Sequence, residues 1–212
     1  MRTLTASAVA GMIFISCLAI SADRDATSKL AKGWFLRTSV PGDYQAGISH
    51  ENVHGGKAAA YFRYTVDPMV VHPSFGPAFL CTAFKADKYQ GHRIRVTAYA
   101  KGEGVADGSF MWIALDGTRT QPRRVALTPA PMKRSTDWTK YVCVVDVASS
   151  MGVITLGAGL SGRGTIWLDD IEVEIVGSDV ALVGIDGKGP GEMQGWNLGE
   201  PSAEPTNLGF EE

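Results

Sequence analysis

The clearest alternation of hydrophobic and polar positions lies in residues 164–176, with the sequence Gly-Thr-Ile-Trp-Leu-Asp-Asp-Ile-Glu-Val-Glu-Ile-Val. Ile166 and Leu168 share one parity, whereas Ile171, Val173 and Ile175 share the other. A period of two with β-branched residues predicts a half-buried strand. The phase changes at Asp169 and Asp170, and a carboxylate pair inside a strand is typical of a bulge, a satisfied turn or a cation site.

Similar short patterns recur along the chain, separated by turns rich in Gly and Pro, and no segment has a convincing helical period. Short strands at this spacing predict an all-β protein built as an antiparallel β-sandwich. The predicted strands are 33–36, 43–49, 58–65, 78–86, 92–101, 109–116, 124–127, 138–147, 153–160 and 164–176.

Two of these strands carry polar and aromatic residues opposite their apolar faces. Arg95 and Tyr99 lie on such a face of one strand, and Trp112 and Asp116 on that of the next. If the strands are neighbours in one sheet, the four side chains share a surface. An aromatic ring can stack on a sugar while a cation and a carboxylate bond its hydroxyls, which makes this set a candidate ligand-binding site. The alternative is ordinary cross-strand pairing beneath a loop.

The N-terminus has the pattern of a secretion signal. Arg2 provides the positive charge, residues 4–20 are apolar or small, and we expect cleavage after Ala22, so that the signal peptide is 1–22. The rival interpretations are a lipoprotein cut before Cys17 and an uncleaved membrane anchor. We therefore expect an exported protein, periplasmic or extracellular, with no stable membrane span after cleavage.

The composition is that of an ordinary globular domain. Of the 212 residues, 45% are hydrophobic and 20% are charged, enough apolar content for one sizeable core. Without the signal peptide the chain has 19 basic and 22 acidic residues, a net charge of −3. Because phosphate binding requires a basic excess, we expect no nucleic-acid partner.

Two cysteines remain after signal cleavage, Cys81 and Cys143. In an exported protein an even pair is compatible with a disulfide. Strand parity places Cys143 toward the core and Cys81 on the same face as Lys85, and side chains on opposite faces cannot be bridged without distortion. Two separate buried thiols are therefore favoured over a disulfide.

Changes in composition divide the chain into segments. Residues 23–32 form a leader, 33–178 the β-sandwich domain, and 179–204 a loop or linker rich in Gly, Pro and Glu. Residues 205–212, Pro-Thr-Asn-Leu-Gly-Phe-Glu-Glu, are not linker-like and are predicted to form a short strand.

Five motifs together resemble a known fold. They are Gly33-Trp34, Gly55-Gly56-Lys57, Tyr89-x-Gly91-x-Arg93-x-Arg95-Val96, Asp137-Trp138-x-x-Tyr141 and Trp167-x-Asp169-Asp170-Ile171. On these residues the chain resembles the galactose-binding-like jelly rolls, which include many carbohydrate-binding modules. It most closely resembles an uncharacterised bacterial domain of this type that is secreted alone or fused to transcriptional regulators. In this resemblance, Trp138 and Trp167 belong to scaffold strands and are expected in the core. Where that domain often carries a longer, charged strand, this chain has residues 112–116 instead.

The resemblance also implies a role for the C-terminal residues. Related modules often open with Asn-x-Gly-Phe-Glu shortly before a Gly-Trp, and here that segment occurs instead at 207–211. We hypothesise that residues 205–212 dock back as an edge strand, a circular permutation of the usual order. In related modules the Glu and the Asp pair help to bind a structural Ca²⁺, which would make Asp169 or Asp170 and Glu211 its ligands. The alternative is that Asp170 only accepts backbone hydrogen bonds.

Catalytic motifs are weak. His50-Glu51-Asn52-Val53-His54 matches the zinc-peptidase motif His-Glu-x-x-His, which requires a helix, yet glycines flank it closely. A third His would be needed at position 60, where the chain has Ala60. No spacing singles out a pair of glycosidase carboxylates. We therefore expect no catalytic residues and no enzyme.

The sequence thus predicts a non-catalytic, extracytoplasmic ligand-binding module whose partner is a carbohydrate. The alternative is a secreted protein-interaction or assembly module without a small ligand. A third, remote alternative is a zinc metallopeptidase that uses His50, Glu51 and His54. Apart from the structural Ca²⁺, no cofactor is expected.

Overall fold

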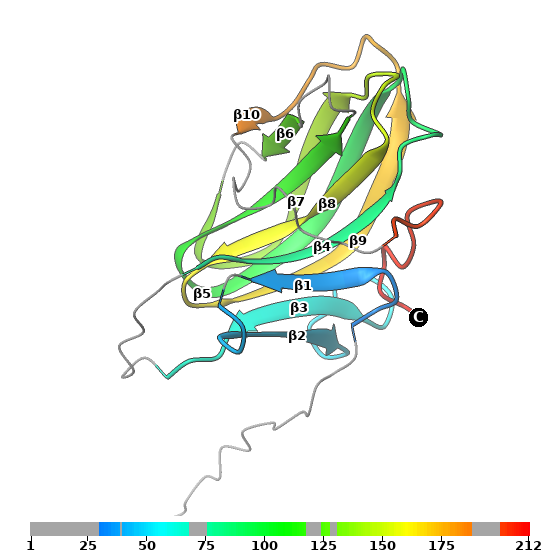
Figure 1. Ribbon diagram of the computed structural model, residues 1–212. Helices are drawn as coiled ribbons and strands as arrows, with labels where there is room; N and C mark the ends of the chain where they lie inside the picture. Colours follow the sequence, from blue (N-terminus) through cyan, green and yellow to red (C-terminus); the bar gives the residue numbers. More distant parts are fainter. Residues whose placement is uncertain (1–29, 39, 68–75, 118–123, 128–130, 188–199) are drawn as a thin grey trace, which may run out of the picture.

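A computed structural model of the chain describes residues 30–38, 40–67, 76–117, 124–127, 131–187 and 200–212. Within these ranges the chain forms strands and turns, without a helix. The strands are β1 (Trp34–Thr38), β2 (Tyr44–Ser49), β3 (Ala59–Tyr64), β4 (Ala78–Lys85), β5 (Arg93–Asp116), β6 (Arg124–Leu127), β7 (Met132–Asp146), β8 (Val153–Ser161), β9 (Thr165–Val176) and β10 (Ile185–Gly187) (Figure 1). The signal peptide and most of the leader lie outside the described residues.

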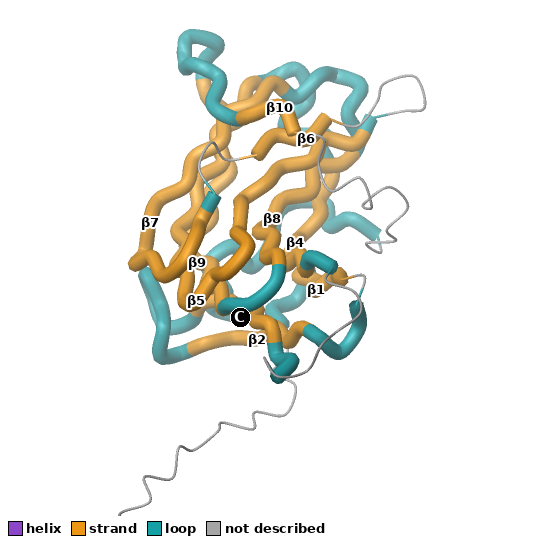
Figure 2. The backbone as a smooth tube through the Cα atoms, turned by 90° about the vertical axis from the view of Figure 1, so that its left-hand side faces the viewer, coloured by secondary structure: helices purple, strands orange, loops and turns teal. Residues whose placement is uncertain are grey.

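The strands are paired antiparallel in the order β1-β4-β8-β5-β9-β3-β2. Strands β6 and β7 also pair with β5, and β10 pairs with β6. Figure 2 shows β7, β9 and part of β5 on one side of the molecule and β8 and β4 on the other. The antiparallel β-sandwich expected from the sequence is confirmed.

Strand β5 belongs to both layers. Its first part pairs with β7 and β9 in what we call the first layer. Its last part pairs with β8 and β6 in the second layer. Between them the register with β7 shifts three times, and Gly104 and Gly108 adopt φ values of 60° and 129°. The prediction of separate strands at 92–101 and 109–116 is therefore wrong, because glycines let one strand bend across the sandwich while β7 follows it.

The two layers enclose one hydrophobic core. Alternate residues of both halves of β5 point into it, including Val96 from the first half and Ile113 from the second. Phe62 of β3, Leu80 of β4 and Leu156 of β8 complete the contact between the layers. The apolar side chains of both halves of β5 therefore belong to the same core cluster and face each other across the sandwich.

The phase change in β9 is a β-bulge. Thr97 of β5 lies opposite Glu172, whereas Tyr99 lies opposite Asp169, so that two residues of β9 face one of β5. Asp170, within the bulge, has a φ of 46°. An extra residue shifts every later side chain to the other face, which explains the change of parity.

In the described part of the chain, Cys81 and Cys143 are buried in separate clusters and are not joined by a disulfide. Cys143 lies in the core between the layers, where burial raises the pKa of its thiol to about 11. Cys81 lies on the opposite side of the second layer, beside Trp112. The parity argument against a disulfide is confirmed.

The segment after β9 differs from expectation at two places. Ile185–Gly187 forms the short strand β10 on β6, although this region was predicted to be loop. Residues 205–212 lie against β1 and β9 but form a turn and irregular backbone, so their prediction as a strand is wrong. The described residues contain no helix long and apolar enough to cross a membrane.

Candidate functional site

The four residues predicted to bind a ligand do not share a surface. Arg95 and Asp116 lie near opposite ends of the bent strand β5. Trp112 is only 1% exposed and meets Phe79 edge to face, with ring centroids 6.2 Å apart. Its assignment to an exposed face is therefore wrong. The outer side of this layer is also apolar, because Gly159 of β8 leaves room for the Phe79 and Phe110 rings of a second hydrophobic cluster.

Arg95 and Tyr99 do lie on the outer face of the first layer, but other side chains engage them. The Arg95 Nε donates to the Glu174 carboxylate at 2.5 Å, and this hydrogen bond lowers the pKa of Glu174. The Tyr99 ring is covered by His54, with a centroid distance of 3.6 Å in a stacked geometry.

A groove lies farther along the same face. Its floor contains Tyr61 of β3 and Trp167 of β9, which are direct cross-strand partners. Both point outward because their neighbours Phe62, Ile166 and Leu168 fill the core. The cavity volume is about 560 Å³, within the usual range for small-ligand sites. Trp167 is expected in the core from its sequence; it lies outside the core cluster, but with 9% exposure only a small part of its side chain lines the groove.

Charged groups surround these rings. The Arg63 guanidinium lies 5.5 Å from the Tyr61 ring centroid and donates from Nη2 to Gln45 Oε1 at 2.9 Å. The Lys101 ammonium lies 5.8 Å from the Trp167 ring centroid and donates to Asn52. With Glu103 exposed at the edge, the groove offers an aromatic floor with hydrogen-bonding groups of both charges.

One wall of the groove comes from residues 48–52, at the end of β2 and the start of the loop to β3. Ser49 Oγ accepts a hydrogen bond from the Asn52 N–H at 3.1 Å. His50 Nδ1 lies 2.8 Å from the Lys57 carbonyl oxygen. Since a carbonyl oxygen only accepts, His50 Nδ1 is the donor in this contact.

The His-Glu-x-x-His motif lies in this loop, not on a helix. His50 contacts Lys57, whereas His54 Nδ1 lies 2.6 Å from Asp170 Oδ2. The two imidazoles therefore have different partners and do not form the zinc-peptidase arrangement. In the described part of the chain, no group of three or more His, Cys, Asp and Glu side chains could hold a metal ion.

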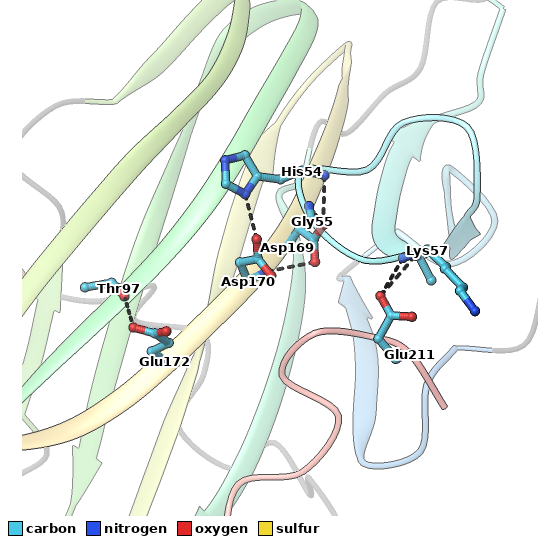
Figure 3. A network of polar contacts seen from close by, with 9 residues as sticks. His54, Gly55, Lys57, Thr97, Asp169, Asp170, Glu172 and Glu211 are labelled. Atoms are coloured by element: carbon cyan, nitrogen blue, oxygen red, sulfur yellow. Dashed lines mark hydrogen bonds and ion pairs between the residues drawn. The ribbon is translucent and has the colours of Figure 1, made fainter.

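The three carboxylates predicted to bind Ca²⁺ gather around residues 54–58, where they accept hydrogen bonds (Figure 3). Asp169 is fully buried and accepts from the backbone N–H groups of His54, Gly55 and Asp170. Glu211 Oε1 accepts from the N–H groups of Lys57 and Ala58. Because the Asp169 oxygens and Glu211 Oε1 accept from N–H donors, a cation could bind these oxygens only by displacing those hydrogen bonds. The Ca²⁺ hypothesis stays a prediction.

The groove residues were not predicted from the sequence, although the alternation of polar and apolar positions indicated that their side chains point outward. Tyr61 and Arg63 alternate with buried Phe62, and Lys101 and Glu103 continue the polar parity of β5. Which strands are adjacent was not readable, because β9 pairs with β3 across a long stretch of sequence.

Comparison with known proteins finds one relative in sequence and several solved structures with a similar fold. No protein-family model matches the chain. The uncharacterized HTH-type transcriptional regulator YbfP of Bacillus subtilis (strain 168) is 34% identical over 185 residues. The match covers 87% of this chain and 58% of the regulator, so the chain spans little more than half of that relative's length.

Two solved structures share the architecture. The enzymatically active domain of bacteriophage CBA120 tailspike protein 4 has a TM-score of 0.51 at 10% identity, covering 68% of this chain and 20% of that one. The C-terminal family 22 carbohydrate-binding module of Clostridium thermocellum Xyn10B has a TM-score of 0.50 at 10% identity, covering 71% and 89%. At such identities the likeness establishes the fold alone: the chain has the jelly-roll β-sandwich found in carbohydrate-binding modules.

Proposed function

We propose that the chain is a non-catalytic carbohydrate-binding module and that the groove over Tyr61 and Trp167 holds the sugar. The observation that carries this proposal is the pair of adjacent aromatic rings on an outward sheet face, flanked by Arg63 and Glu103. The apolar face of a sugar ring can stack on such side chains, while its hydroxyls bond the charged groups. Arg63 and Lys101 have long flexible stems that can turn toward a ligand.

The acidic residues of the groove support binding without hydrolysis. Glu51 and Glu103 are the carboxylates that line it, and both are exposed. A general acid of a glycosidase is kept protonated by an apolar pocket, which neither residue has.

The test is isothermal titration of the purified protein against soluble polysaccharides, including xylan, galactan and mixed-linkage glucan. Replacing Trp167 or Tyr61 by Ala should weaken binding about 10-fold or more, because truncating an aromatic anchor at the centre of a contact commonly costs that much. Tyr61→Phe keeps the ring and serves as the matched control. Binding unaffected by Trp167→Ala and Tyr61→Ala would refute the proposed site.

The signal-like N-terminus supports export, to the periplasm or the exterior, as a further part of the proposal. Mass spectrometry of the mature N-terminus should find cleavage after residue 22. A chain retained intact in the cytoplasm would contradict it.

A protein-interaction module is the second candidate, favoured by the similarity to a transcriptional regulator. Within the described ranges, Leu182 and Ile175 are the exposed large hydrophobic side chains, at 56% and 44%. A flat response to every polysaccharide would favour this candidate.

A further inference from the structure

The C-terminal tail, residues 205–212, is bound tightly to the sandwich. Phe210 is 2% exposed and lies against the Trp34 ring, with centroids 4.8 Å apart. The Trp34 Nε1–H donates to the Asn207 carbonyl at 3.1 Å, and the Ile171 N–H donates to the Leu208 carbonyl at 3.1 Å. The tail is thus anchored to both β1 and β9.

This docking brings Glu211 to the loop between β2 and β3. Its Oε1 accepts from the Lys57 N–H at 2.7 Å and from the Ala58 N–H at 3.3 Å. Gly56 makes room for the carboxylate, because a Cβ at this position would overlap Glu211, and its φ of 62° also favours glycine. Figure 3 shows Glu211 reaching from the tail to Lys57.

The same Lys57 connects the tail to the groove. Its N–H is held by Glu211, and its carbonyl oxygen accepts from His50 Nδ1 at 2.8 Å. His50 belongs to the wall of the groove together with Glu51 and Asn52. A continuous path of two hydrogen bonds therefore runs from the tail to the wall.

The loop has independent anchors at its centre. Asp169 holds the His54 and Gly55 N–H groups, and Tyr99 stacks on the His54 ring. These contacts fix the middle of the loop on the sheet but leave Lys57 without another hydrogen bond to the body of the domain among those described. The β2–β3 ladder begins two residues later, where Ala59 pairs with Ser49, and Glu211 is the side chain that holds the Lys57 N–H itself.

We propose that Glu211 is a positioning residue for the carbohydrate groove: through Lys57 and His50, the docked tail sets the wall of the binding site. This proposal rests on the proposed function of the groove. A ligand that contacts His50 binds more weakly when the hydrogen-bonded position of His50 is populated only part of the time. Loss of a charge-assisted hydrogen bond at a partly exposed site should reduce the population enough to weaken binding roughly 3- to 10-fold.

The experiment compares Glu211→Ala, Glu211→Gln and Glu212→Ala in the full chain. Glu212 is the adjacent exposed acid, so its replacement removes the same charge without the loop contact. Glutamine retains an oxygen that can accept from the Lys57 N–H. The measurements are ¹H–¹⁵N spectra of the amides of residues 49–58 and the dissociation constant for the polysaccharide that wild type binds.

We expect Glu211→Ala to shift the Lys57 and His50 amides and to weaken binding, with Glu211→Gln close to wild type and Glu212→Ala unchanged. Dispersed spectra of both Glu211 variants would show that the fold persists. Unmoved His50 and Asn52 amides in Glu211→Ala would overturn the proposal. If wild type bound no polysaccharide, the proposed function would fail, while the amide shifts would still decide whether the tail sets the wall.

Discussion

Asp169 connects two distant parts of the chain through one buried side chain. Its Oδ2 accepts from the N–H groups of His54 and Gly55, and its Oδ1 accepts from the N–H of Asp170. Burial raises the pKa of Asp169, while the three backbone donors act in the opposite direction. The carboxylate thereby satisfies donors that the bulge and the loop leave without strand partners.

Replacing Asp169 by Asn should lower the free energy of unfolding by about 2 kcal/mol, because the amide nitrogen places a donor against a buried N–H. Asp170→Asn is the matched control. The Asp170 side chain is 42% exposed and pairs with His54, so its replacement should cost less than about 1 kcal/mol. Urea unfolding of the two variants measures the difference, and equal losses would contradict this role of Asp169.

At the scale of elements, glycines decide where strands can bend and approach each other. Gly104 and Gly108 accompany the bend of β5, whereas Gly157 in β8 lies between Cys81 of β4 and Trp112 of β5. A Cβ at Gly157 would overlap the Leu80 carbonyl. The close packing of three strands therefore depends on the absence of a side chain there.

Gly157→Ala should destabilise the protein by about 3 kcal/mol, since the overlap is with backbone that cannot move aside cheaply. Gly152→Ala should change stability by less than about 0.5 kcal/mol, because the nearest atom to its Cβ is 4.0 Å away. Thermal melting of the two variants checks this prediction. Similar melting temperatures would show that β8 can shift to accept the methyl group.

Most strands could be predicted from sequence because alternation survives wherever one face is buried. The phase change at 164–176 had a bulge as one of its three interpretations, since an extra residue must change the parity. It failed at Trp112, where both faces of the layer are apolar and parity no longer separates buried from exposed. Likewise, the sequence pattern predicts two strands in place of β5, because the glycine-rich bend of β5 has the composition of a turn.

At the scale of the whole molecule, the groove depends on segments that are far apart in sequence. Tyr61, Glu103 and Trp167 come from three adjacent strands, and the wall is linked to Glu211 near the C-terminus. Strand order is set by tertiary pairing, so the site could not be assembled from the sequence. The C-terminal motif could be recognised, but its turn conformation and its contact with Lys57 could not.

The most direct test of the carbohydrate site uses the tryptophan side chains themselves. The chain has five tryptophans, and each gives one indole N–H signal in a ¹H–¹⁵N spectrum. Titration with an oligosaccharide should move the signal of Trp167, assigned with Trp167→Phe, and leave that of buried Trp112 in place. Saturable binding with the Trp167 signal unmoved would show that the sugar binds elsewhere and would contradict the account.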